Sequence, residues 1–255
     1  MYLTDTHVHL NMKEFQGDLD EVIERAHKQN VKQMVNIGYN IKSSVESLEL
    51  AKKYPFIYAA LGVHPHDAKK VEKDYIETLR RLAKDSKVIA IGEIGLDYYR
   101  DLSPRDVQKR VFIEQLELAI SLGLPVIIHE REAKRDTLDI VKRYRKDIKN
   151  GIFHAFSGGE EFLKEYLDID FYYGIGGVIT FKNAHKLRSI VKKLPLNRIL
   201  VETDSPYLTP HPFRGRRNEP GFVTLVRDHL SLILGISQDE MDYVLYKNTK
   251  RILGI

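Results

Sequence analysis

The chain has 255 residues, of which 43% are hydrophobic and 30% are charged, the balance of a soluble globular protein rather than a disordered one. It contains no cysteine, which excludes disulfides, thiolate metal sites, iron–sulfur clusters and cysteine nucleophiles. The net charge of +4 is too small to identify a nucleic-acid-binding protein by itself. No apolar run reaches the roughly 20 residues of a membrane span, and the amino terminus lacks the pattern of a secretory signal. We therefore expect a cytoplasmic enzyme with no membrane partner and no obligate protein partner.

Eight short apolar segments, rich in β-branched residues, have the length and composition of buried strands. The predicted strands are residues 3–7, 33–38, 57–63, 88–94, 125–129, 151–156, 171–177 and 199–204. No linker or low-complexity stretch separates them, which predicts one domain over residues 1–255.

Amphipathic segments lie between the predicted strands. Asp18 with Glu21, and Ser43 with Glu46, have the spacing of capping boxes at the start of the first two helices. A long helix is predicted to open at Ser103-Pro104, with proline at its first position, and to close at Gly123. Further helices are predicted near residues 132–145, 160–167, 184–194 and 222–234, with a last one starting at Ser237 and Glu240.

Eight alternations of strand and helix in about 250 residues predict an α/β fold of the (β/α)8 TIM-barrel type. The alternative is a doubly wound open sheet, which often carries a glycine-rich phosphate loop after its first strand. Here the first strand continues instead into Thr6-His7-Val8-His9, which favours the barrel.

Histidines are concentrated at the predicted strand ends. Random placement of the ten histidines would put about one at the carboxyl ends of the strands, where barrel enzymes build their active sites, but six lie there. The six are His7, His9, His64, His66, His129 and His154.

His7 and His9 alternate along a strand, so both side chains can face the same side. Asp5 shares their parity and is expected to support them, because a buried carboxylate needs a partner. The alternative is that His7 and His9 are simply polar residues on an exposed strand end.

Glu93 lies in an apolar run at the end of the fourth predicted strand, where an unpaired carboxylate is costly. Its neighbours Gly92 and Gly95 would let a ligand or metal approach the backbone closely. The alternative is a structural ion pair with Arg100 or Arg131.

His129, His154 and Asp204 each end a further predicted strand. Taken singly, the two histidines are more often hydrogen-bonded core residues than ligands, and Asp204 has the position of a cap or turn residue. Glu202 lies two residues before Asp204 and faces the same side of the strand, so it is a candidate to support a ligand through a hydrogen bond.

If the barrel is right, six groups converge on one rim: His7, His9, Glu93, His129, His154 and Asp204. Nitrogen and oxygen donors in this ratio suit zinc, manganese, iron or nickel better than calcium. Six donors exceed the needs of one four-coordinate ion, which indicates two divalent ions that share a bridging carboxylate.

With these residues in place, the sequence resembles the TatD family of metal-dependent deoxyribonucleases in the amidohydrolase superfamily. The motifs that carry the resemblance are residues 5–9 (DTHVH), 62–66 (GVHPH), 92–99 (GEIGLDYY), 125–129 (PVIIH), 154–158 (HAFSG), 202–208 (ETDSPYL) and 214–220 (RGRRNEP). The match covers essentially the whole chain. Ala155 departs from the family pattern, which commonly has cysteine there.

The resemblance implies a TIM-barrel hydrolase with two divalent ions, with zinc, manganese or magnesium as candidates. One ion would be held by His7, His9, Glu93 and Asp204, and the other by Glu93, His129 and His154, with Glu93 bridging. Family members act on DNA, often from the 3′ end, so the expected substrate is DNA, either single-stranded or at 3′ ends. A water activated by the two ions would cleave the phosphodiester bond.

Asp204, Glu93 and His64 are the expected catalytic residues. Asp204 would accept a proton from the attacking water unless a bridging hydroxide needs no separate base, and His64 would donate to a phosphate or to the leaving group. His64 and Arg131, together with Arg214 in the basic loop that also holds Arg216 and Arg217, are candidate substrate contacts. Alternatively, His64 is a packed loop histidine and Arg131 is ion-paired. The basic loop is then simply solvated. Tyr98, Tyr99 and Tyr207 are candidates for stacking on an unpaired base or for the edge of the core.

Three other functions remain open at this point. A carboxyl-ester, lactone or phosphotriester hydrolase on the same barrel often has a carboxylated lysine where this chain has Glu93. A hydrolase that deacylates aminoacyl-tRNA would keep the metals and the basic rim. A binding protein with an inert metal site is disfavoured by the complete set of six ligands.

Overall fold

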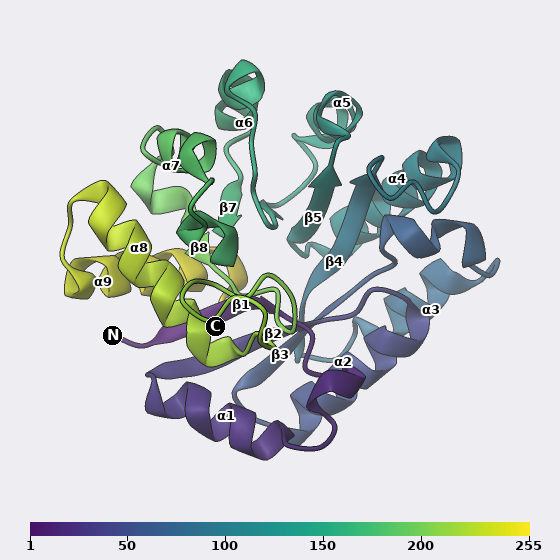
Figure 1. The fold of residues 1–255 in the computed structure, drawn as a ribbon. Coiled ribbons are helices and arrows are strands. Elements are labelled where there is room, and N and C mark those ends of the chain that lie inside the picture. The colour runs from purple at the N-terminus through teal and green to yellow at the C-terminus, as the bar shows by residue number, and fades with distance from the viewer. The chain divides into compact units, whose positions relative to one another are not determined.

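The computed structural model describes residues 1–255 and shows eight strands that alternate with helices (Figure 1). The strands are β1 (Leu3–Val8), β2 (Val31–Ile37), β3 (Ile57–Leu61), β4 (Val88–Asp97), β5 (Val126–Arg131), β6 (Gly151–Phe153), β7 (Tyr172–Ile175) and β8 (Ile199–Val201). All eight predicted strands are present. Their ends differ from the prediction: β4 continues three residues beyond Ile94, whereas β6 and β8 each end three residues earlier than predicted.

The helices are α1 (Leu19–Lys28), α2 (Ile41–Lys53), α3 (Tyr75–Leu82), α4 (Arg105–Leu122), α5 (Lys134–Tyr144), α6 (Leu163–Ile169), α7 (His185–Val191), α8 (Val223–Leu234) and α9 (Gln238–Leu253). The sequence prediction had not located α3. Every helix is either too short or too polar to span a lipid bilayer.

The strands belong to one sheet in the order β1 to β8. Pairing is parallel between β1 and β2, β3 and β4, β4 and β5, β5 and β6, and β7 and β8. A doubly wound sheet would break this sequential order at a switch point. The predicted (β/α)8 fold class is therefore confirmed.

The chain divides into two compact units. The first unit comprises Met1–Asn36, Ala155–Leu163 and Tyr172–Ile255, and the second comprises Ile37–His154 and Lys164–Phe171. The prediction of a single domain over residues 1–255 stays a prediction.

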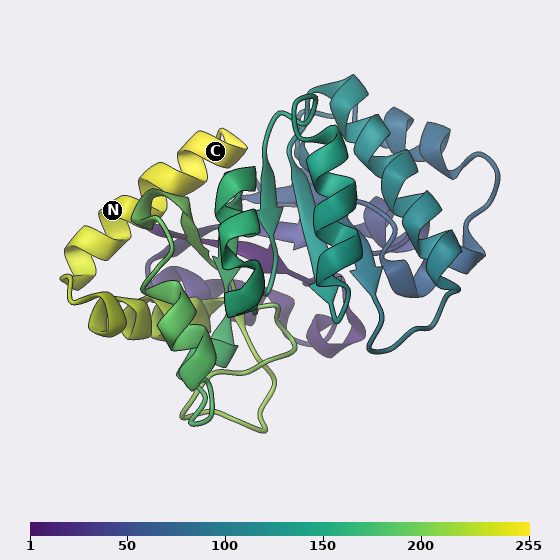
Figure 2. The ribbon, with the colours of Figure 1, turned by 90° about the horizontal axis from the view of Figure 1, so that it is seen from above.

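In the first unit, α9 packs against β1 and β8, and α8 packs against α9. Figure 2 shows α9 beside the N-terminal segment, where the rings of Tyr2 and Tyr246 meet edge to face at 5.0 Å. Beyond the strands, the amide N–H of Asp204 donates to the carbonyl of His7 at 2.9 Å. The amide N–H of His9 donates to the carbonyl of Ser205, also at 2.9 Å. These bonds join the end of β1 and the residue after it to the segment that follows β8.

In the second unit, α4 and α5 pack against β4 and β5 (Figure 1). All ten residues of β4 are buried, as expected of a parallel strand covered on both faces. A charged residue in such a strand must be paired or ligated. Glu93 and Asp97 are the two charged residues of β4.

Two predicted helix starts are wrong in detail. Asp18 does precede α1, but its side chain makes no cap hydrogen bond. Its carboxylate instead accepts two hydrogen bonds from the guanidinium of Arg217, at 2.7 and 2.6 Å. For α2, the capping box is formed by Asn40 and Ser43 rather than by Ser43 and Glu46.

Two other helix boundaries agree more closely. Pro104 stands at the N-cap of α4, one position before the predicted one, and Gly123 closes this helix in the left-handed conformation at φ 65°. Ser237 caps α9 as predicted, since its hydroxyl accepts the amide N–H of Glu240 at 3.1 Å.

Candidate metal centre

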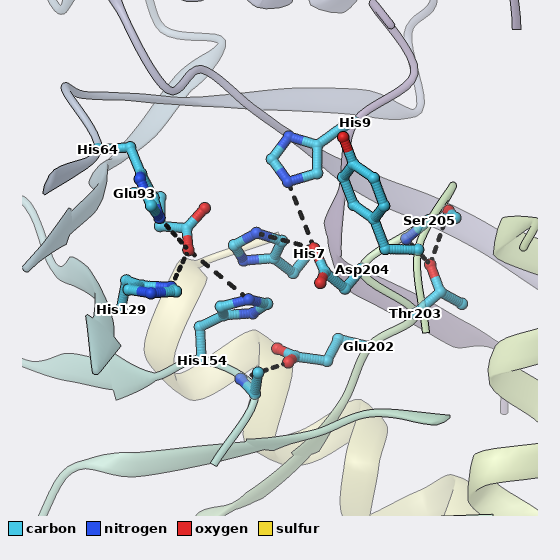
Figure 3. Close-up of polar contacts among 12 residues, drawn as sticks. His7, His9, His64, Glu93, His129, His154, Glu202, Thr203, Asp204 and Ser205 are labelled. Atoms are coloured by element: carbon cyan, nitrogen blue, oxygen red, sulfur yellow. Dashed lines mark hydrogen bonds and ion pairs between the residues drawn. The ribbon is translucent and has the colours of Figure 1, made fainter. Parts of the chain in front are cut away.

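In the first unit, three predicted ligands form a compact group, which we call the first ligand group: His7, His9 and Asp204 (Figure 3). Oδ1 of Asp204 lies 3.4 Å from Nε2 of His9 and 3.8 Å from Nε2 of His7. Both histidines are buried, whereas the side chain of Asp204 is 15% exposed. The predicted convergence of these three residues is observed within this unit.

The local backbone explains how Asp204 reaches the histidines. It follows β8 with φ at +57°, a left-handed conformation that aspartate tolerates better than most residues. Residues in such conformations are concentrated at functional sites, where the surrounding structure holds them. Here the bond from the Asp204 amide N–H to the carbonyl of His7 supplies that support.

Asp5 supports the first ligand group through the backbone rather than through an imidazole. Its carboxylate accepts the hydroxyl of Thr203 at 2.5 Å and the amide N–H groups of Thr203 and His7 at 2.9 and 3.3 Å. Burial raises the pKa of the Asp5 carboxyl to about 8, although these hydrogen bonds oppose the rise. Asp5 therefore ties the residues around two ligands together.

Glu202 was predicted to support a ligand, and the structure places its carboxylate close enough to bind a metal ion itself. It is buried, and its Oε1 accepts the amide N–H of Ala155 at 2.6 Å. Its carboxylate also lies within 4.8 Å of a ring nitrogen of His7. Space for it depends on Gly174, because a Cβ there would lie 2.1 Å from Oε2 of Glu202.

In the second unit, Glu93 faces three imidazoles (Figure 3). Its Oε1 lies 2.8 Å from Nδ1 of His129 and 3.7 Å from Nε2 of both His64 and His154. We call these four residues the second ligand group. The predicted partners His129 and His154 are present, and His64 joins them. The alternative ion pair of Glu93 with Arg100 or Arg131 is not observed, and both arginines are exposed.

The glycines beside Glu93 serve a different purpose from the predicted one. Gly95 pairs with His129 across β4 and β5, with φ at +143°, and a Cβ there would lie 2.0 Å from the carbonyl oxygen of His129. A Cβ at Gly92 would lie 2.6 Å from Cβ of Ile127. The close approach is thus made by strand β5, not by a ligand, and it brings Glu93 and His129 together.

Asp97, at the end of β4, was missed by the sequence prediction. It is fully buried, and its Oδ2 lies 2.8 Å from Nε2 of His66 and 3.2 Å from Nε2 of His129. Burial disfavours its charged form, but the hydrogen bonds from His129 and His66 hold the pKa of Asp97 below its ordinary value. The available signal was a second carboxylate four residues after Glu93 in an otherwise apolar run.

The same contacts set the charge of the histidines. Burial lowers the pKa of His129, but its hydrogen bonds to Asp97 and Glu93 outweigh that effect and raise the pKa to about 9. Burial and the neighbouring His129 hold the pKa of His64 well below its usual value, so this ring is neutral at pH 7. Its Nδ1 accepts the amide N–H of His66 at 3.2 Å.

Two buried glutamines of α4 fix the backbone of the second ligand group. Gln115 accepts the amide N–H of Val63 at 2.7 Å and donates to the carbonyl of the same residue at 3.1 Å. Gln108 makes the corresponding pair of bonds with Asp97, at 2.9 and 3.3 Å. A single helix thus holds the segments that carry His64 and Asp97.

Of the predicted substrate contacts, Arg131 and Arg214 are exposed, whereas His64 is buried. The guanidinium of Arg131, in the second unit, stacks 3.9 Å from the ring centroid of Tyr99, which is 61% exposed. In the first unit, the guanidinium of Arg214 stacks at the same distance over Phe181.

The other residues named with them have varied surroundings. Arg217 forms ion pairs with Asp18 and Glu219, so its guanidinium is bound within the protein and is not offered to a phosphate. Tyr98 donates to Asp136 at 2.6 Å, whereas Tyr207 is half exposed, with its ring 6.4 Å from that of His9.

Both ligand groups fit divalent metal ions. In the first, the ligand atoms of all three residues lie within 4.8 Å of one another, and the same holds for His64, Glu93 and His129 in the second. Buried imidazoles that face a carboxylate are the donors that zinc, manganese and related ions prefer. The donor sets can therefore hold a metal ion in each unit.

Comparison with known proteins supports a metal-dependent enzyme. Residues 4–254 match the family model described as TatD related DNase. The chain is 42% identical over 253 residues to the metal-dependent hydrolase YabD of Bacillus subtilis, covering 99% of both chains. It is 34% identical over 257 residues to the 3′-5′ ssDNA/RNA exonuclease TatD of Erwinia tasmaniensis, covering 98% of this chain and 99% of that protein.

A solved structure gives the same result. The crystal structure of YJJV, a TatD homolog from Escherichia coli K12, superposes with a TM-score of 0.94 at 32% identity, covering 99% of this chain and 98% of that one. The predicted resemblance and the predicted metal-dependent hydrolase are confirmed. The alternative of an ester, lactone or aminoacyl-tRNA hydrolase is not favoured by these proteins.

Proposed function

Because the chain belongs to the TatD related DNase family, we propose that it is a metal-dependent nuclease that removes nucleotides from the 3′ ends of single-stranded DNA. The observation that carries the proposal is the pair of buried donor groups, each with a carboxylate facing imidazoles. The exonuclease name of the Erwinia relative supports the choice of substrate.

We propose one divalent ion at each ligand group, with zinc, manganese or magnesium as candidates. His7, His9 and Asp204 would hold one ion, and Glu93, His129 and His154 the other. When bound, such ions neutralise phosphate charge and lower the pKa of water. The bridging role of Glu93 stays a prediction.

Asp204 is proposed as the proton acceptor. Of the three residues in its group it is the one with appreciable exposure, so a water molecule can reach its carboxylate. His64 is proposed as the donor to a phosphate oxygen or to the leaving group. Because Nδ1 of His64 accepts an amide N–H, its neutral ring carries the proton on Nε2, the atom that faces Glu93.

Arg131 and Arg214 are proposed to bind backbone phosphates of the substrate. A guanidinium that stacks on an aromatic ring leaves its edge N–H groups available for phosphate oxygens. Tyr99 is exposed beside Arg131 and offers a ring face on which an unpaired base can stack. Replacing Arg131 by Gln should raise KM for single-stranded DNA and flatten its dependence on salt, with little change in kcat.

The test is a cleavage assay on 5′-labelled single- and double-stranded oligonucleotides, with magnesium, manganese and zinc added separately. An aryl ester and an aminoacyl-tRNA serve as competing substrates. We expect a ladder of products shortened from the 3′ end of the single strand, and no cleavage by the Glu93→Gln variant. Turnover of the ester or the aminoacyl-tRNA with no cleavage of DNA under any metal would overturn the proposal.

A further inference from the structure

Asp97 is a buried carboxylate that the proposed mechanism does not use. One of its oxygens, Oδ2, contacts Nε2 of both His66 and His129. The other, Oδ1, accepts the amide N–H groups of Tyr99 at 3.0 Å and Arg100 at 2.7 Å. With both oxygens committed, the carboxylate has a single orientation.

The orientation of Asp97 determines what His129 can offer. The ring of His129 lies between two carboxylates, with Nδ1 toward Glu93 and Nε2 toward Asp97. Asp97 can only accept a hydrogen bond when ionised, so Nε2 must carry a proton. Without an ion, Nδ1 likewise donates to Glu93. Glu93 is itself a proposed ligand of the ion whereas Asp97 is not, so a bound ion would replace the Nδ1 proton and take the lone pair of Nδ1.

We propose that Asp97 is a positioning residue that keeps the His129 proton on Nε2 and so presents Nδ1 to the ion of the second ligand group. The presence of that ion rests on the proposed function. Carboxylates that hold the far nitrogen of a ligating histidine in this way commonly contribute 10- to 100-fold to metal affinity. His66 is the second donor to Oδ2 and keeps the carboxylate turned toward the ring.

Asp97→Asn is a sharp test because it changes the hydrogen-bonding pattern at nearly constant shape. If the amide oxygen keeps the bonds to Tyr99 and Arg100, the amide nitrogen faces His129 as a donor. Nε2 must then accept, and the proton moves to Nδ1, which can no longer ligate. Asp97→Glu restores a carboxylate and should recover part of the affinity.

The experiment is a titration of the metal-free full chain with Zn²⁺, in which isothermal titration calorimetry measures the affinity of each site. For Asp97→Asn we expect one of two Zn²⁺ sites to weaken by about 10- to 100-fold while the other keeps its affinity. Asp101→Asn is the matched control, since Asp101 lies four residues away, is exposed and pairs with Arg105. It should bind Zn²⁺ as the wild type does.

Nitrogen-15 NMR of the histidine rings in the Zn²⁺-loaded protein gives the readout that a purely structural role would not move. We expect the metal-shifted resonance of His129 at Nδ1 in the wild type and its loss in Asp97→Asn. Wild-type affinity at both sites in Asp97→Asn, or a metal-shifted Nε2 in the wild type, would overturn the proposal. If Asp97→Asn does not fold, the wild-type spectrum decides, because a metal-shifted Nε2 of His129 would still overturn the proposal.

Failure of this inference is distinguishable from failure of the proposed function. Unchanged Zn²⁺ affinity in a variant of an active nuclease rejects only the role of Asp97. A selective loss of Zn²⁺ from a chain that cleaves no DNA rejects only the nuclease.

Discussion

The two ligand groups hold similar donors in place by different means. In the first unit, His7 and Asp204 are fixed through the main chain, because Asp5 and the carbonyl of His7 bind the amide groups around them. In the second unit, the imidazole of His129 is fixed through side chains, between Glu93 and Asp97. The first arrangement sets where the ligands lie and the second also sets which ring nitrogen is offered, so substitutions should affect the two groups differently.

The largest expected effect is on turnover. Asp204→Asn should lower kcat for single-stranded DNA by about 10²- to 10⁴-fold, the usual contribution of a positioned acid or base. The fold should persist, because asparagine tolerates the positive φ of this position and has the same shape. Circular dichroism and thermal melting check the fold, and single-turnover kinetics check the rate. Undiminished turnover would remove Asp204 from the mechanism.

The second largest expected effect is on the amount of metal bound, which should distinguish the two ligand groups. His129→Ala should lower the bound metal by about one ion per chain, and His9→Ala should do the same at the other group, because each removes a ligand from one donor set. Elemental analysis after dialysis measures the content. The comparison becomes sharper with Asp97→Asn added, which should act like His129→Ala and unlike His9→Ala. Unchanged metal content in His129→Ala would contradict its assignment as a ligand.

The sequence predicted the features that neighbouring residues determine and missed those that depend on distant segments of the chain. The strands, and the positions of His7 and Glu93 on them, were predicted because local composition and parity determine them. The role of Asp97 was not, because its partners His66 and His129 come from other segments of the chain. The prediction ended the fourth strand at Ile94, whereas the structure continues it to Asp97.

Helix starts failed for a related reason. The side chain of Asp18 has the right spacing to cap α1, but it binds Arg217, which is 199 residues away in the sequence. Local spacing cannot reveal such a competitor. The capping box of Asn40 and Ser43 was missed by a shift of three residues along the same segment.

The smallest expected effect concerns the loop that follows Asp204 and that Arg217 anchors to Asp18. The hydrogen bonds from Arg217 lower the pKa of Asp18 from 3.8 to about 2, so this pair stabilises the folded state above about pH 4 and ceases to do so as the pH falls toward 2. Both side chains are about one-third exposed, and solvent therefore limits the gain to about 1 kcal/mol or less. Asp18→Asn should reduce the free energy of unfolding by that amount at pH 7, with the difference from wild type shrinking between about pH 4 and 2 and in added salt. Urea unfolding at each pH measures it, and Asp147→Asn, at an exposed position, is the control. A difference that grows on acidification would show that the loop is not held by this ion pair.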